Sequence, residues 1–106
     1  MPKYLFAATL TESGVQGVLK EGGTSRRDAL TRTAESVGGT LDAFYFAFGE
    51  TDVYLIVDLP DAAAAAALSM TTSATGAVRV RTTVLITPEE MDEAKAKSVE
   101  YRPPGA

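Results

Sequence analysis

Residues Thr40–Asp61, TLDAFYFAFGETDVYLIVDLPD, decide the fold of this chain. They hold two runs rich in aromatic and β-branched residues, Thr40 to Phe48 and Val53 to Leu59, joined by a short polar turn. Helical patterns flank this pair, and a further strand is predicted toward each end of the chain. The order strand, helix, strand, strand, helix, strand is typical of an α+β, ferredoxin-like domain with a four-stranded antiparallel sheet and helices on one face.

The hairpin within this stretch also predicts which side chains share a face. If Gly49–Asp52 is a four-residue loop, three Phe residues of the first strand oppose three aliphatic residues of the second. The predicted pairs are Phe48 with Val53, Phe46 with Leu55, and Phe44 with Val57. This side is suited to packing beneath helices, whereas the side that carries Tyr45 and Tyr54 mixes polar and apolar residues.

Upstream of the hairpin, the pattern predicts one strand and an interrupted helix. The strand covers about Lys3 to Leu10, and Thr11 is placed to cap a short helix that Gly22-Gly23 interrupts. Thr24 or Ser25 is expected to cap the second helical segment. The remaining features of that segment are a capping-box-like Asp28, an apolar stripe of Leu30, Ala34 and Val37, and an end at Gly38-Gly39.

Downstream, Pro60-Asp61 opens an alanine-rich helix, which a strand at about Ala77 to Ile86 follows. Thr87–Glu90 has the sequence of a capping box with Pro at the first helical position, so a short C-terminal helix is expected. Residues 98–106 contain two prolines and are predicted to form an extended tail. We expect residues 1–106 to form a single domain.

Composition excludes several classes of function. The chain has 10 basic and 14 acidic residues, a net charge of −4, and no run of Lys or Arg, which disfavours binding to nucleic acid or to an anionic membrane surface. No apolar run approaches the ~20 residues that a membrane span needs. The strand predicted directly after Met1-Pro2 leaves no room for a signal peptide, so a cytoplasmic location is expected.

The residue types that are missing narrow the chemistry further. The sequence contains no Cys, His, Trp or Asn, so disulfides, thiolate nucleophiles, histidine ligands and a Ser-His-Asp triad are excluded. We therefore expect neither a metal nor a cofactor. Any chemistry must come from carboxylates, Arg, Lys, Tyr, hydroxyl groups or the backbone.

Nearly the whole chain resembles the GYD-domain family of small bacterial proteins. The resemblance is carried by AFYFAFGETDVYLIVDLPD, GVLKEGGTSRR, GAVRVRT, and the segment from TPEEMDEA to KSVEYRPPG. It implies a subunit of the dimeric α/β-barrel group, whose members pair through their open sheet faces, and hence a homodimer or larger homo-oligomer. The Gly-Tyr-Asp motif of the family corresponds to Gly49, Thr51 and Asp52, with Thr51 in place of the tyrosine.

Two charged sites near the hairpin each have a functional and a structural interpretation. Asp52 is either a carboxylate base or ligand acceptor at the rim of the barrel, or a turn residue that binds its own backbone. Arg79 and Arg81 alternate onto one side of their strand. They form either an anion clamp for a carboxylate or phosphate, or ion pairs on an edge strand with partners such as Asp42, Asp58 or a residue of a second subunit.

Two further groups of residues have the same ambiguity. Tyr45 and Tyr54 are expected to lie diagonally across the two hairpin strands on the mixed side of the sheet, where they would stack on an aromatic ligand, donate a proton, or fill a subunit interface. Residues 22–27, GGTSRR, resemble a backbone anion site at a helix N-terminus but lack the spacing of a nucleotide-binding loop. A capped helix kink with two solvated arginines is the simpler interpretation.

Three functions follow from these observations. The first is a homo-oligomeric module that binds a small anionic or aromatic molecule in a cavity between sheets, using Tyr45, Asp52, Tyr54, Arg79 and Arg81. The second is a cofactor-independent oxygenase or isomerase, which rests on analogy with the barrel group. The third is a structural protein that exists to assemble.

Overall fold

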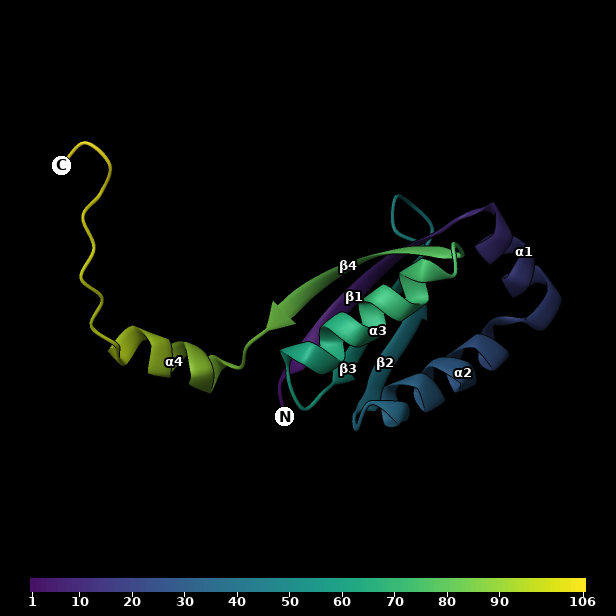
Figure 1. Cartoon of the computed structure of the whole chain (residues 1–106), viewed down its shortest axis with the longest axis horizontal. Coiled ribbons are helices and arrows are strands. Elements are labelled where there is room, and N and C mark those ends of the chain that lie inside the picture. The colour runs from purple at the N-terminus through teal and green to yellow at the C-terminus, as the bar shows by residue number, and fades with distance from the viewer.

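A computed structural model describes all residues, 1–106, and has the expected α+β fold (Figure 1). The four strands form one antiparallel sheet in the order β2-β3-β1-β4, which is the order of a ferredoxin-like domain. The elements in chain order are β1 (Lys3–Leu10), α1 (Glu12–Glu21), α2 (Gly23–Ser36), β2 (Thr40–Phe46), β3 (Val53–Asp58), α3 (Ala62–Ala74), β4 (Val78–Leu85) and α4 (Pro88–Ala96).

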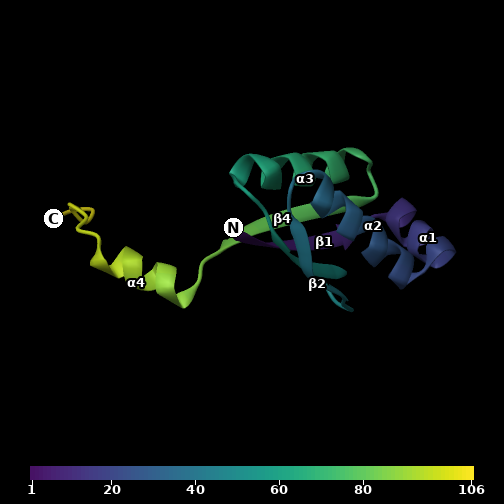
Figure 2. The same cartoon turned by 90° about the horizontal axis from the view of Figure 1, so that it is seen from below.

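Helices α2 and α3 lie on one face of the sheet, α1 lies beyond the end of β1, and no helix covers the other face (Figure 2). Side chains alternate along each strand, so β1 and β3 send every second residue into the core beneath the helices. Phe6, Val57 and Leu59 are the largest side chains with almost no exposed surface. The opposite residues of the same strands form the open face, as the sequence predicted.

Glycines join the helices to their neighbours at points where an L side chain would be strained. Gly22 has a φ of 83° and turns the chain from α1 into α2, which begins at Gly23 without a side-chain cap. The predicted capping box of Ser25 with Asp28 is therefore wrong, because both residues already lie inside the helix. The predicted end at Gly38-Gly39 is confirmed: Gly38 has a φ of 84°, and Gly39 donates its N–H to Ala34.

The hairpin pairs two residues away from the predicted register. Phe46 lies opposite Val53 and Phe44 opposite Leu55, with a bulge between Leu41 and Ala43. The loop closes where the Ala47 N–H donates to the Asp52 carbonyl oxygen at 2.7 Å, so its four residues are 48–51, one position earlier than the predicted 49–52. Phe48 falls inside this loop and is fully exposed, rather than packed beneath the helices.

Helix α3 and strand β4 form as their residues predict. The Asp61 carboxylate accepts the Ala64 N–H at 2.8 Å and caps α3, whose alanines allow it to lie close to the sheet. Val78 and Val80 of β4 pack against the core. Arg79 and Arg81 alternate with them and therefore face the open side.

The C-terminal residues project away from the body of the domain (Figure 1). The capping box predicted for α4 is confirmed: Thr87 and Glu90 bond each other's backbone N–H groups. Every residue from 86 to 106 is exposed, and the molecule is accordingly 56 Å along its longest axis. None of the helices combines the length and the apolar character that crossing a bilayer requires.

Candidate functional site

Asp52 connects the hairpin to the neighbouring strand. Its carboxylate accepts the N–H of Leu10 at 2.8 Å, and its own N–H donates to the Ala8 carbonyl at 2.9 Å. These bonds continue the pairing of β1 with β3 beyond the regular ladder. The carboxylate thus satisfies an N–H group of the neighbouring strand. The structural interpretation had instead expected a bond to the backbone of its own turn.

Thr51 and Arg81 meet on the open face. The Arg81 guanidinium donates to Thr51 Oγ1 at 2.6 Å, and the Thr51 residue is only 8% exposed. The Thr9 hydroxyl donates to the Glu50 carbonyl at 3.1 Å, which holds the loop over the C-terminal end of β1. The hairpin loop therefore lies on the open side of the sheet, where the bond from Arg81 to Thr51 holds it in place.

Tyr45 and Tyr54 lie directly opposite each other on β2 and β3, not diagonally as predicted. Ala7 follows Tyr54 across the sheet, and Arg81 follows Ala7, so one row contains two phenols and a guanidinium. Tyr45 is 71% exposed and Tyr54 41% exposed. This row, Tyr45–Tyr54–Ala7–Arg81, has no covering element and forms no enclosed cavity within one chain.

A cluster of charges occupies the opposite end of the open face. Lys3 forms ion pairs with Asp42 and, at 3.6 Å, with Asp58. The hydrogen bond to Asp42, opposed by partial desolvation and assisted by the charges of both carboxylates, raises the pKa of the Lys3 ammonium above its ordinary 10.5. Asp42 and Asp58 are therefore occupied by Lys3, and they are not the partners of Arg79 and Arg81 that the sequence suggested.

The opposite face of the sheet contains an apolar cavity that the sequence did not reveal. Helix α2 lies against edge strand β2 and α3 against edge strand β4, so a gap remains over the central strands β1 and β3. The cavity fills this gap and has a volume of about 70 Å³. All four strands and α1, α2 and α3 contribute to its lining, and 12 of the 14 lining residues are hydrophobic.

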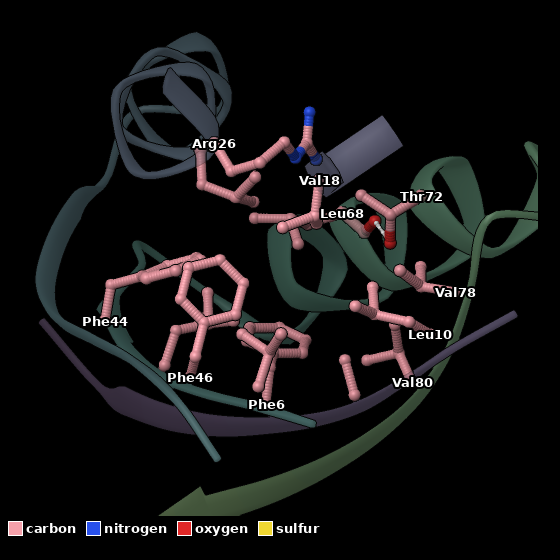
Figure 3. A pocket seen from close by; sticks show the side chains of 14 residues that line it. Phe6, Leu10, Val18, Arg26, Phe44, Phe46, Leu68, Thr72, Val78 and Val80 are labelled. Atoms are coloured by element: carbon pink, nitrogen blue, oxygen red, sulfur yellow. Dashed lines mark hydrogen bonds between the residues drawn. The ribbon is translucent and has the colours of Figure 1, made fainter. Parts of the chain in front are cut away.

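Arg26 reaches from α2 across the mouth of this cavity toward Val18 of α1 (Figure 3). Phe6, Phe44 and Phe46 form its aromatic side, with the Phe44 and Phe46 rings edge to face at 5.2 Å. The other polar side chain of the lining is Thr72, whose hydroxyl donates to the Leu68 carbonyl at 2.9 Å. The cavity therefore presents aromatic and aliphatic walls with one cation at its entrance.

Comparison with known proteins assigns the chain to a family. The family model described as GYD domain matches residues 4–94 of the 106 residues. This protein belongs to the GYD-domain family. Neither the curated proteins nor the solved structures contain a match to it.

Two of the three residues that the sequence predicts to correspond to the GYD motif form contacts within the chain. Asp52 accepts the Leu10 N–H, and Thr51 accepts a hydrogen bond from Arg81. Gly49 has open space around its Cα, so no contact within the chain requires a glycine there. The hairpin loop brings Thr51 and Arg81 together, whereas Arg79 lies apart, beside a shallow hollow that Glu12 also lines.

The cavity residues lie too far apart in sequence to form a motif. The one local signal was GGTSRR, where both arginines were expected to be solvated. Arg27 is exposed, with its Nε 3.7 Å from Asp28, and fits that expectation. Arg26 does not: it is half-buried, because its position on α2 directs it toward the cavity.

Proposed function

We propose that this GYD-domain protein is a homo-oligomeric module that binds a small aromatic or anionic molecule. The apolar cavity beneath α1, α2 and α3 is the observation that supports it. Concave sites with apolar walls and few polar groups are typical of small-molecule binding. A ligand group that enters the cavity gains about 25 cal/mol for each Å² of apolar surface that is removed from water.

The cavity lining favours binding over catalysis. Its two polar side chains are Arg26 and Thr72, and it contains none of the carboxylates, lysines or tyrosines that serve as general bases. The carboxylate closest to the GYD motif, Asp52, is bonded to the backbone and does not line the cavity. An oxygenase or isomerase reaction would need a base at the ligand, and the lining provides none.

The open face supports the assembly part of the proposal. Tyr45, Tyr54 and the half-buried Ile56 form an apolar surface that lacks a covering element, and a second copy of the chain would bury it. Two such faces together would enclose a second space, lined by the tyrosines with Arg79 and Arg81. That space is a second candidate position for an anionic or aromatic ligand.

Binding is tested by ¹H–¹⁵N NMR titration with single-ring probes such as phenylacetate and phenylacetamide. We expect shift changes at residues that line the cavity, and their loss in Val18→Phe, which fills the cavity. Val15→Phe is the matched control, because Val15 is on the same helix but is exposed and does not line the cavity. If neither probe shifts any cavity resonance, the binding proposal is wrong.

Assembly is tested by sedimentation equilibrium. We expect the wild-type chain to form a dimer or larger oligomer and Tyr45→Asp to weaken it. Leu19→Asp is the control, because Leu19 is also exposed but lies on helix α1 and not on the sheet. A wild-type monomer at all concentrations would contradict the assembly proposal and leave the binding proposal intact.

A further inference from the structure

We propose that Arg26 is the binding partner of an anionic group on the ligand. The cavity then selects a small aromatic or aliphatic acid over a neutral molecule of the same shape. This inference rests on the proposed binding function and specifies the chemical class of the ligand.

Arg26 is half-buried without a polar partner, whereas Arg79, which also lacks one, is exposed. Arg81 donates to Thr51, and Arg27 lies beside Asp28. Arg26 forms neither a side-chain hydrogen bond nor an ion pair within the chain, although it is half-buried against apolar walls. A guanidinium that has lost part of its hydration gains more from a carboxylate than an exposed one does, so this position favours an anion.

The size of the cavity places the anionic group at the mouth. A cavity of about 150 Å³ binds benzene, whereas this one has about 70 Å³. A ring or short branched chain therefore fits only partly, unless the side chains at the mouth move. Phe46, which is 40% exposed, is the least buried of the lining residues. The rest of the ligand must project from the mouth, which Arg26 crosses.

The shape of Arg26 also selects among anions. Its planar guanidinium presents parallel N–H groups, which match the two oxygens of a carboxylate. Thr72 on the far wall supplies no positive charge, and no acidic side chain lines the cavity to repel an anion. The expected ligand thus has one apolar group of about ring size and one carboxylate, separated by a short linker.

Three probes of similar shape and different charge test this inference. Phenylacetate, phenylacetamide and benzylamine are titrated into the ¹⁵N-labelled full-length protein at neutral pH. We expect phenylacetate to bind about tenfold more tightly than phenylacetamide. A charge-assisted hydrogen bond at a partly exposed site contributes a difference of this size. Benzylamine should bind most weakly, because its ammonium is repelled by Arg26.

Variants at two adjacent arginines identify the source of the preference. Arg26→Gln should abolish the difference in affinity between phenylacetate and phenylacetamide. Arg26→Lys should keep part of this difference, and Arg27→Gln should leave it unchanged. Equal affinities for acid and amide in the wild type would overturn the inference while leaving the binding function standing, and so would a preference that survives Arg26→Gln. Failure of all three probes to bind would refute both proposals.

Discussion

Replacing Gly14 by alanine should destabilise the protein, although the same change three residues later in the same helix should stabilise it. A Cβ atom built on Gly14 lies 2.1 Å from the Ala77 carbonyl oxygen, whereas a Cβ on Gly17 has open space around it. Ordinary van der Waals contact begins at 3.4 Å, so α1 must move away from the start of β4 by about 1.3 Å to accommodate Gly14→Ala.

The contacts between α1 and the turn before β4 set the size of the effect. The Ala77 oxygen accepts the Thr11 N–H at 2.9 Å, and the Thr11 hydroxyl donates to the Gly76 carbonyl at 2.6 Å. Displacing α1 costs about 1–3 kcal/mol in overpacking and about 1 kcal/mol in total for the two hydrogen bonds, which are weakened but not broken. Alanine recovers about 1 kcal/mol of helix propensity, which leaves a net loss of about 2 kcal/mol.

Urea unfolding followed by circular dichroism measures both variants. Gly17→Ala should raise the free energy of unfolding by about 0.5–1 kcal/mol, and Gly14→Ala should lower it by about 2 kcal/mol, with unchanged m values. Val18 lies one turn after Gly14 and lines the cavity, so Gly14→Ala should also weaken binding of the ring probes. A Gly14→Ala protein as stable as Gly17→Ala would refute the close packing of α1 on Ala77.

Three smaller predictions concern the rest of the chain. Asp52→Ala should lose about 1–3 kcal/mol of unfolding free energy, because the Leu10 N–H loses its acceptor. Asp52→Asn keeps an acceptor and should lose less than half of that amount. Equal losses in the two variants would mean that the negative charge of Asp52, and not its hydrogen bond alone, stabilises the fold. The raised pKa of Lys3 means that its ion pairs stabilise the fold at neutral pH and that this contribution disappears as the pH rises above 10.5. The difference in unfolding midpoint between wild type and Lys3→Gln should therefore shrink there, and a difference that persists would contradict the pairing. Residues 87–106 form no hydrogen bond to residues 1–86, so a chain that ends at Ile86 should have a free energy of unfolding within about 0.5 kcal/mol of that of the full chain. A larger loss of stability would show that this segment packs on another copy.

Local patterns predicted the elements and the faces of the sheet, but not the register of the hairpin. Where the hairpin closes, Asp52 bonds to β1, a strand more than 40 residues earlier in the chain. Nothing within the hairpin sequence indicates that contact. The error was two residues, and a shift of two preserves the side to which each strand residue points. Tyr45 and Tyr54 were therefore assigned to the correct face even though their predicted pairing was wrong.

The cavity was unpredictable for a different reason. It exists because α2 and α3 lie over opposite edges of the sheet and fail to meet above its centre. That separation is a property of helix placement and leaves no periodicity or spacing in the sequence. Arg26 and Arg27 are neighbours of the same type, and only the direction of each on α2 decides which one enters the cavity.

The two faces of the sheet allow binding and assembly to be separated. The mouth of the cavity, with Arg26, is on the helix-covered side, whereas Arg81 and the tyrosines are on the open side. A second copy that covers the open face would leave the mouth accessible. Arg26→Gln should then change ligand selectivity in an intact oligomer. Tyr45→Asp should weaken the oligomer while the cavity keeps its preference for a carboxylate. Simultaneous loss of both properties in either variant would mean that the partner subunit completes the cavity.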